Sequence, residues 1–246
     1  MAIPRTHLEN APIVEAVIDF RVVSQEQVSA ETFADLGSSV GEQYAKAGSI
    51  QSIEARFGVL HGKPLGASQI LTDIGFRYQT ATEIAQFRVD GFTFSKTVPY
   101  TTWEEVSDEA FRLWKVYVDA AKPRQVSRVA VRYINQMQLP AVKDLGEYLT
   151  APIQLPEPIP QMIREFLTRV CVHDDKRNAS AVIVQALEPR VDDPNTISLL
   201  LDIDAFREIR ESPDDPELPS VFAQLRQLKN EIFFASITEK IVEKYA

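Results

Sequence analysis

Arginine residues recur in segments of this sequence whose polar and apolar residues alternate as in β-strands. A guanidinium group binds carboxylates and phosphates through paired hydrogen bonds, so several arginines on one sheet face would form an anion-binding site. The residues that we predict for such a site are Arg56, Arg77, Arg88 and Arg132. The alternative is structural, because an antiparallel sheet with one solvated face carries charges that pair across its strands.

Asp202 and Asp204 are the candidate metal ligands. They lie two residues apart in a strand-like segment and therefore share one face, opposite Leu201 and Ile203. Adjacent carboxylates repel one another unless they are solvated, paired with arginine or bridged by a hard cation such as Mg²⁺. A metal-dependent enzyme acting on a phosphorylated or nucleotide-like anion would combine these aspartates with the arginines. A solvent-facing or arginine-paired strand edge explains the same residues without a catalytic role.

Common motifs for phosphate binding and nucleophilic catalysis are absent from the sequence, which contains no GxxxxGK[ST], GxGxxG or GxSxG pattern. The histidines (His7, His61 and His173) lack the spacing of a local zinc site, and His61 and His173 are interpreted as loop residues at the exits of predicted strands. Cys171 is the only cysteine, fits a reducing cytoplasm, and is predicted to be buried and inert. We therefore predict no cofactor and leave open whether any reaction is catalysed.

Phe233 and Phe234 stand side by side in the last predicted helix, Ser220–Tyr245, and must point in different directions. In one interpretation, one ring serves the core and the other belongs to a dimer or partner surface. In the other, the helix lies in a cleft between two sheets and is buried on both sides.

Strand-like and helix-like segments alternate along the first half of the chain. A strand is predicted over Ile13–Val23, where apolar and charged residues alternate. A helix is predicted over Trp103–Ala121, because Thr102 and Glu105 form a capping box and Pro123 ends the segment. Between them we expect a helical stretch from Val28 to Tyr44, then strands at Ile53–Leu60, Gly75–Thr80 and Ile84–Lys96.

The same order of elements restarts near residue 124. The predicted elements are strands at Val126–Leu139, Phe166–His173, Ala179–Leu187 and Thr196–Phe206, a short helix at Asp144–Leu149, and the last helix. We therefore predict an α+β fold that arose by internal duplication. Its two similar units, residues 1–122 and 123–246, would each have an antiparallel sheet with helices packed on one face, and would be fused into one compact body. A groove at their junction is the expected place for a ligand.

Three segments carry a resemblance to known proteins: NAPIVEAVIDFRV at Asn10–Val22, RYIN at Arg132–Asn135 and FFASITEKIVEKY at Phe233–Tyr245. They look like a sporadically distributed family of uncharacterised bacterial proteins. The resemblance implies a bacterial, cytoplasmic protein with a free-standing domain of this length. The family has no established activity, so the resemblance implies no catalytic residue.

Composition narrows the classes of partner. The 246 residues include 26 Lys and Arg against 35 Asp and Glu, for a net charge of −9. This acidic balance argues against nucleic acid, because phosphate binding needs a basic face. A membrane-spanning helix would need about 18 or more apolar residues in a row, and none is present. The N-terminus also lacks a signal-peptide pattern.

Three functions remain as hypotheses. The leading one is a non-enzymatic binding or regulatory module that engages a protein partner or a small ligand through the groove or the last helix. The second is the metal-dependent enzyme described above. The third is a structural homo-oligomer, of which a homodimer is the simplest form.

Overall fold

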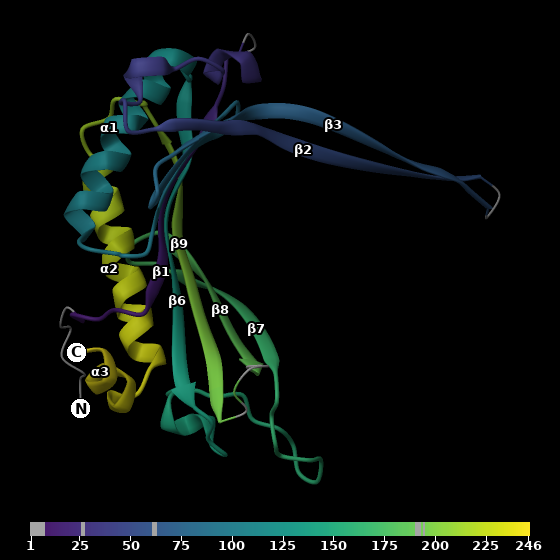
Figure 1. Ribbon diagram of the computed structural model, residues 1–246, viewed down its shortest axis with the longest axis vertical. Helices are drawn as coiled ribbons and strands as arrows, with labels where there is room; N and C mark the ends of the chain where they lie inside the picture. Colours follow the sequence, from purple (N-terminus) through teal and green to yellow (C-terminus); the bar gives the residue numbers. More distant parts are fainter. Residues whose placement is uncertain (1–7, 26–27, 61–62, 190–192, 194) are drawn as a thin grey trace.

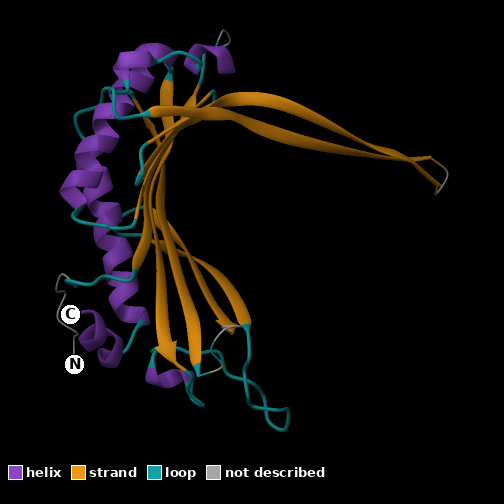
Figure 2. Cartoon of the chain, in the orientation of Figure 1, coloured by secondary structure: helices purple, strands orange, loops and turns teal. Residues whose placement is uncertain are grey.

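The computed structural model describes residues 8–246 except 26–27, 61–62, 190–192 and 194, and it describes no side chains over 54–70 or at 189. Its strands form one antiparallel sheet of nine strands in the order β2-β3-β4-β5-β1-β6-β9-β8-β7. The helices lie on one face of this sheet (Figures 1 and 2), so the α+β class is confirmed. The strands are β1 (Ile13–Val23), β2 (Ala45–Leu60), β3 (Lys63–Gln79), β4 (Glu83–Arg88), β5 (Gly91–Thr97), β6 (Gln125–Pro140), β7 (Phe166–Asp174), β8 (Ala179–Pro189) and β9 (Thr196–Glu211). The helices are α1 (Trp103–Ala121), α2 (Leu218–Ser236) and α3 (Glu239–Tyr245).

The two central strands, β1 and β6, pair with one another and join the two halves of the chain in one sheet. Both follow the predicted alternation. Ile18 and Phe20 of β1 and Val131 of β6 are buried beneath the helices. Asp19 of β1 and Arg128 of β6 lie on the opposite face, which we call the open face, and they contact one another there.

Aromatic side chains hold α1 and α2 against the sheet. Phe20 stacks on Trp114 of α1 with ring centroids 4.1 Å apart, and its centroid lies 4.7 Å from that of Phe222 on α2. The predicted bounds of α1 are confirmed, and the Thr102 hydroxyl accepts a hydrogen bond of 3.2 Å from the backbone N–H of Glu105. Buried aromatic area of this kind dominates the stabilisation of a core.

Local turns account for the main differences from the predicted elements. The helical stretch expected between Val28 and Tyr44 contains only 3₁₀ turns, at Ala30–Phe33 and Gly37–Ser39, because Gly37 adopts φ +44° and interrupts any longer helix. The strand predicted over Ile84–Lys96 is the hairpin of β4 and β5. The single last helix predicted from the sequence is divided into α2 and α3, because Ile237 is extended and forms a bridge with Leu149.

A long hairpin arm leaves the sheet on the side away from the helices (Figure 1). It consists of β2 and β3, of which the predicted strands Ile53–Leu60 and Gly75–Thr80 are only parts. The β3 strand pairs with β4 only over Gly75–Gln79, so its preceding residues have β2 as their one strand neighbour within the described chain. The arm is therefore held to the protein at its base.

No helix of the residues described here is both long and apolar enough to cross a membrane.

Candidate functional site

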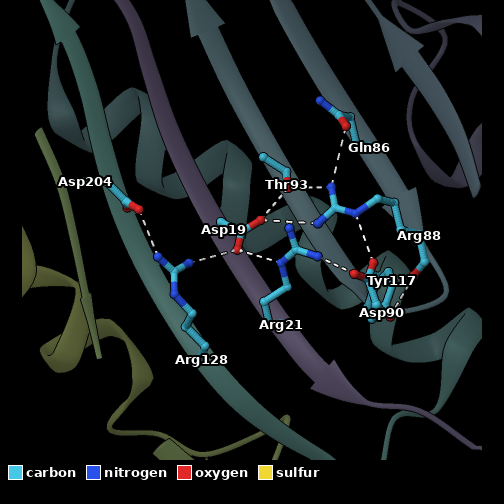
Figure 3. Close-up of polar contacts among 9 residues, drawn as sticks. All are labelled: Asp19, Arg21, Gln86, Arg88, Asp90, Thr93, Tyr117, Arg128 and Asp204. Atoms are coloured by element: carbon cyan, nitrogen blue, oxygen red, sulfur yellow. Dashed lines mark hydrogen bonds and ion pairs between the residues drawn. The ribbon is translucent and has the colours of Figure 1, made fainter. Parts of the chain in front are cut away.

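A group of ion pairs crosses the centre of the open face (Figure 3). We call it the arginine–aspartate cluster, and it consists of Asp19 and Arg21 of β1, Arg88 of β4, Asp90 of the following turn, Arg128 of β6 and Asp204 of β9. Asp19 is its centre. Arg88 donates to the Asp19 carboxylate at 3.3 Å and Arg128 donates to it at 3.4 Å, while Thr93 donates to it at 2.6 Å.

Strand register brings the members of the arginine–aspartate cluster together. Thr93 lies directly opposite Asp19 in the pairing of β1 with β5. Arg128 also donates to Asp204 at 2.9 Å, and in this way it links β1 to β9 across β6. Burial raises the pKa of Asp204, and the nearby Arg128 guanidinium acts in the opposite direction. The cluster therefore matches aspartates with arginines in a partly buried network, which is the structural alternative foreseen for the strand charges.

The three predicted anion-binding arginines whose side chains are described do not converge on one point. Arg88 is buried and engages Asp19 and Asp90, whereas Arg132 holds Asp202 through two hydrogen bonds of 2.8 Å and 2.6 Å. Arg77 is exposed on β3, opposite Gln86 of β4. Arg56 lies in β2 and its side chain is outside the described part of the structure.

The predicted metal ligands each face an arginine. Asp202 is bound by Arg132 and Asp204 by Arg128. Over the residues for which the structure gives positions, no group of three or more His, Cys, Asp and Glu residues could hold a metal ion. The arrangement thus resembles the arginine-paired strand edge that was the alternative to a metal site.

Cys171 and His173 lie on the edge strand β7. Cys171 is exposed, so the prediction of a buried cysteine was wrong, because β7 has a strand neighbour on one side only and no helix covers it. His173 was expected in a loop but lies within β7, where its Nδ1 atom is 2.9 Å from the Ser180 hydroxyl of β8. His7 and His61 lie outside the described residues.

A pocket of about 250 Å³ lies on the helix side of the sheet. Its walls come from the segment Leu8–Ile13, from β6 and from α2, and thus from both halves of the chain. The segment is fixed by backbone hydrogen bonds from Asn10 to Tyr245 of α3 (3.1 Å) and from Gln136 to Pro12 (2.8 Å). These bonds fix one wall of the pocket against β6 and α3.

Lys229 of α2 is a lysine on the apolar face of the helix, and it lines this pocket. The residue is 6% exposed, and its Nζ atom lies 3.5 Å from the centroid of the Tyr133 ring. Within the described chain it has neither a hydrogen bond nor an ion pair. Removal from water lowers the pKa of Lys229 well below its usual value, and the positive charge of Arg226 lowers it further.

The position of Lys229 follows from helix geometry. Leu225, Lys229 and Phe233 are spaced by four residues, so they fall on one face of α2, and this face packs on the sheet. Lys229 was not among the site residues predicted from the sequence. The sequence feature that could have indicated it is a single lysine in the middle of an apolar helical stripe.

Polar groups of the other pocket walls are Tyr100, Tyr133 and Asn135. The two tyrosine hydroxyls lie 3.0 Å apart, and burial raises the pKa of both. The Asn135 amide nitrogen donates to the backbone oxygen of Leu201 at 2.9 Å and to that of Tyr133 at 3.4 Å. These contacts hold the wall of the pocket in place.

Phe233 and Phe234, the predicted partner surface, both line the pocket. Phe233 is buried and Phe234 is half-buried, and their rings meet edge to face with centroids 5.2 Å apart. Neither ring is exposed as a patch. Packing at the pocket wall within one chain therefore accounts for both rings.

No family model matches this chain, and no curated protein matches it either. The resemblance of the Asn10–Val22, Arg132–Asn135 and Phe233–Tyr245 segments stays a prediction. Residues of all three segments, among them Ile13, Tyr133 and Phe233, line the pocket.

Proposed function

We propose that this protein is a non-enzymatic binding module that holds a small organic ligand in the pocket around Lys229. The observation that carries the proposal is the Lys229 side chain, which is buried, faces the pocket and lacks an acceptor among the described residues. Arg207 Nε is the one fully enclosed side-chain nitrogen or oxygen atom without a hydrogen-bond partner among the described residues, so the Lys229 Nζ atom is open to the pocket. An oxygen group of a bound ligand would supply the missing partner.

The walls support a ligand with a compact apolar body. The rings of Tyr133, Phe233 and Phe234 surround the pocket, and Leu8 and Ile13 close it. A volume of about 250 Å³ suits a small molecule rather than a peptide. The ligand would thus place its oxygen group near Lys229 and its apolar part between the rings.

Thermal unfolding of the purified protein with small organic acids, aldehydes and ketones tests the proposal. A ligand at about 100 times its dissociation constant stabilises a protein by about 2.7 kcal/mol, which shifts the melting temperature by several degrees. We expect such a shift for the native chain and for Lys115→Met, an exposed control on α1. We expect no shift for Lys229→Met. Equal shifts in Lys229→Met, or none with any compound, would contradict the proposal.

The alternative of a metal-dependent enzyme receives less support. Two of its four arginines already bind aspartates, so an anionic substrate would have to break the pairs of Arg88 and Arg132. The proposed module would lie in the cytoplasm, where the exposed thiol of Cys171 would stay reduced.

We also infer that the two halves arose by duplication. Support comes from the strand order, which is β1-β5-β4-β3-β2 on one side and β6-β9-β8-β7 on the other, so the two sides match except for the additional outer strand β2. Each half begins with a central strand and, after its last strand, continues into a long helix on the same face, α1 or α2. Superposition of the halves should align β1 with β6 and α1 with α2, and any other best alignment would contradict the inference.

A further inference from the structure

Lys229 differs from an ordinary anion-binding lysine in its surroundings. Its Nζ atom lies over the Tyr133 ring, and Arg226 is a neighbouring cation on the same helix. Both the loss of water and the adjacent positive charge favour the neutral amine over the ammonium ion. A neutral amine attracts a carboxylate only weakly, but it is a good nucleophile toward a carbonyl carbon.

We propose that Lys229 captures small aldehydes or ketones as a reversible imine, and this inference rests on the small-ligand function proposed above. The ligand would be a carbonyl compound with an apolar or aromatic body, held between the rings of the pocket. Its carbonyl carbon would face the Nζ atom of Lys229.

The reaction needs no oxidant, reductant or cofactor. The lone pair of the Lys229 nitrogen attacks the carbonyl carbon, so that a C–N bond forms and the π electrons of the carbonyl move to oxygen. A proton passes from nitrogen to this oxygen, which gives a carbinolamine. Loss of one water molecule then forms the C=N bond, and addition of water reverses the sequence and releases the ligand.

Neighbouring groups are suited to this step. Tyr100 and Tyr133 line the same pocket with linked hydroxyls, which can donate a hydrogen bond to the carbonyl oxygen and help the leaving oxygen to accept a proton. Once the imine takes up a proton, its positive charge would lie near the face of the Tyr133 ring, where a cation is favoured.

Among the described residues, the charged groups around the pocket leave the amine without a carboxylate partner. Arg226 of α2 lies 3.6 Å from Glu104 of α1, and Glu231 is bound by Arg177 at 2.7 Å. The lining residues of the Leu8–Ile13 segment are Leu8, Ala11 and Ile13, which carry no charge. The remaining titratable neighbours are the neutral Tyr100 and Tyr133. The electrostatic surroundings therefore favour the neutral, nucleophilic amine over the ammonium ion.

Benzaldehyde followed by sodium borohydride tests the inference, because borohydride reduces an imine to a stable secondary amine. An exposed lysine has a pKa of about 10.4 and is almost wholly protonated at pH 7, so it reacts slowly. We expect a single benzyl adduct on the full chain at pH 7, located by peptide mass mapping at Lys229. The labelling rate at Lys229 should exceed that at exposed Lys115 at least about tenfold.

The matched variants are Lys229→Met and Lys229→Arg, with Lys115→Met as the exposed control. Adduct formation should disappear in the first two and persist in the third, and far-ultraviolet circular dichroism verifies that each variant is folded. Labelling spread over exposed lysines with no preference for Lys229 would overturn the inference. A parallel thermal-shift assay with benzoate and benzaldehyde separates the two proposals. A shift that depends on Lys229 without any adduct would refute covalent capture alone, whereas neither shift nor adduct would refute both.

Discussion

The Nζ atom of Lys229 lies 3.5 Å from the centroid of the Tyr133 ring, and this contact joins α2 to the central strand β6. Tyr133 is buried to 2% exposure and its hydroxyl is bound to that of Tyr100, so the ring cannot turn away without breaking that contact. The face of the Tyr133 ring replaces part of the hydration shell that the Lys229 amino group would have in water. A polar nitrogen is thereby kept at a pocket wall without an acceptor of its own.

Stability should depend on pH through Lys229. Because burial lowers the pKa of the folded lysine, the unfolded chain binds its proton more readily, and stability rises with pH up to the unfolded pKa of about 10.4. The slope is about 1.4 kcal/mol per pH unit for one proton. Lys229→Met should be more stable than the native chain at pH 7, and this advantage should shrink toward pH 10. Urea unfolding at several pH values measures the difference, with Lys115→Met expected to follow the native slope. Parallel slopes for the native chain and Lys229→Met would refute the prediction.

Loss of Asp19 should weaken the fold strongly. Asp19→Asn removes the negative charge with which both Arg88 and Arg128 pair, and the Arg88 side chain is only 8% exposed. Breaking such a buried pair costs about 3–5 kcal/mol, because a charge is left without a partner. Glu147→Gln is the control, since its pair with Lys240 is about half exposed and should contribute less than about 1 kcal/mol. Denaturant unfolding measures the free energy of unfolding of both variants. Similar small losses in Asp19→Asn and Glu147→Gln would show that the arginine–aspartate cluster does not hold the strands together.

Gly91 should not tolerate a side chain. It adopts φ +156°, and a Cβ atom there would lie 2.1 Å from the backbone oxygen of Phe20 on the adjacent strand. Gly91→Ala should therefore cost about 3 kcal/mol or more, because two paired strands must separate. Gly48→Ala is the matched control, with φ +136° but nothing within 4 Å of the added carbon, and should cost about 1 kcal/mol. If Gly91→Ala and Gly48→Ala lowered the free energy of unfolding equally, the close approach to Phe20 would not be the reason that position 91 requires glycine.

The outer part of the hairpin arm, residues 53–71, should be dispensable for folding. Replacing residues 53–71 by a short turn removes backbone that pairs only within the hairpin, so the free energy of unfolding should change by less than about 1 kcal/mol. Tyr78→Phe, at the base of the same hairpin, is the contrasting variant. The Tyr78 hydroxyl donates to the Phe33 backbone oxygen at 2.8 Å and accepts from Leu36 N–H at 3.1 Å, and its loss should cost about 1–3 kcal/mol. A large loss on shortening the arm would show that it stabilises the sheet.

Elements with a local cause were predictable from the sequence. The bounds of β1 and α1 agree with the predictions, because strict alternation and a capping box each depend on residues close together in the chain. The single strand predicted over Ile84–Lys96 was wrong, because a turn at residues 89–90 divides it into β4 and β5. This turn interrupts neither the alternation of apolar residues nor their preference for strand, so the sequence pattern did not reveal it. The α+β class was predictable for the same local reasons, whereas the single sheet that joins both halves was not.

Sequence alone determined which residues alternate on β1, β6 and β9, and it placed Asp202 and Asp204 on one face of their strand. It did not determine their partners, because register between distant strands is set by the packing of the whole sheet. Only the tertiary structure decided that arginine meets aspartate on the open face. Only the tertiary structure likewise decided that Lys229 would face a pocket. The environment of that side chain depends on Tyr100, Tyr133 and the segment Leu8–Ile13, which are distant in sequence and meet only when helix, strand and terminal segment pack together.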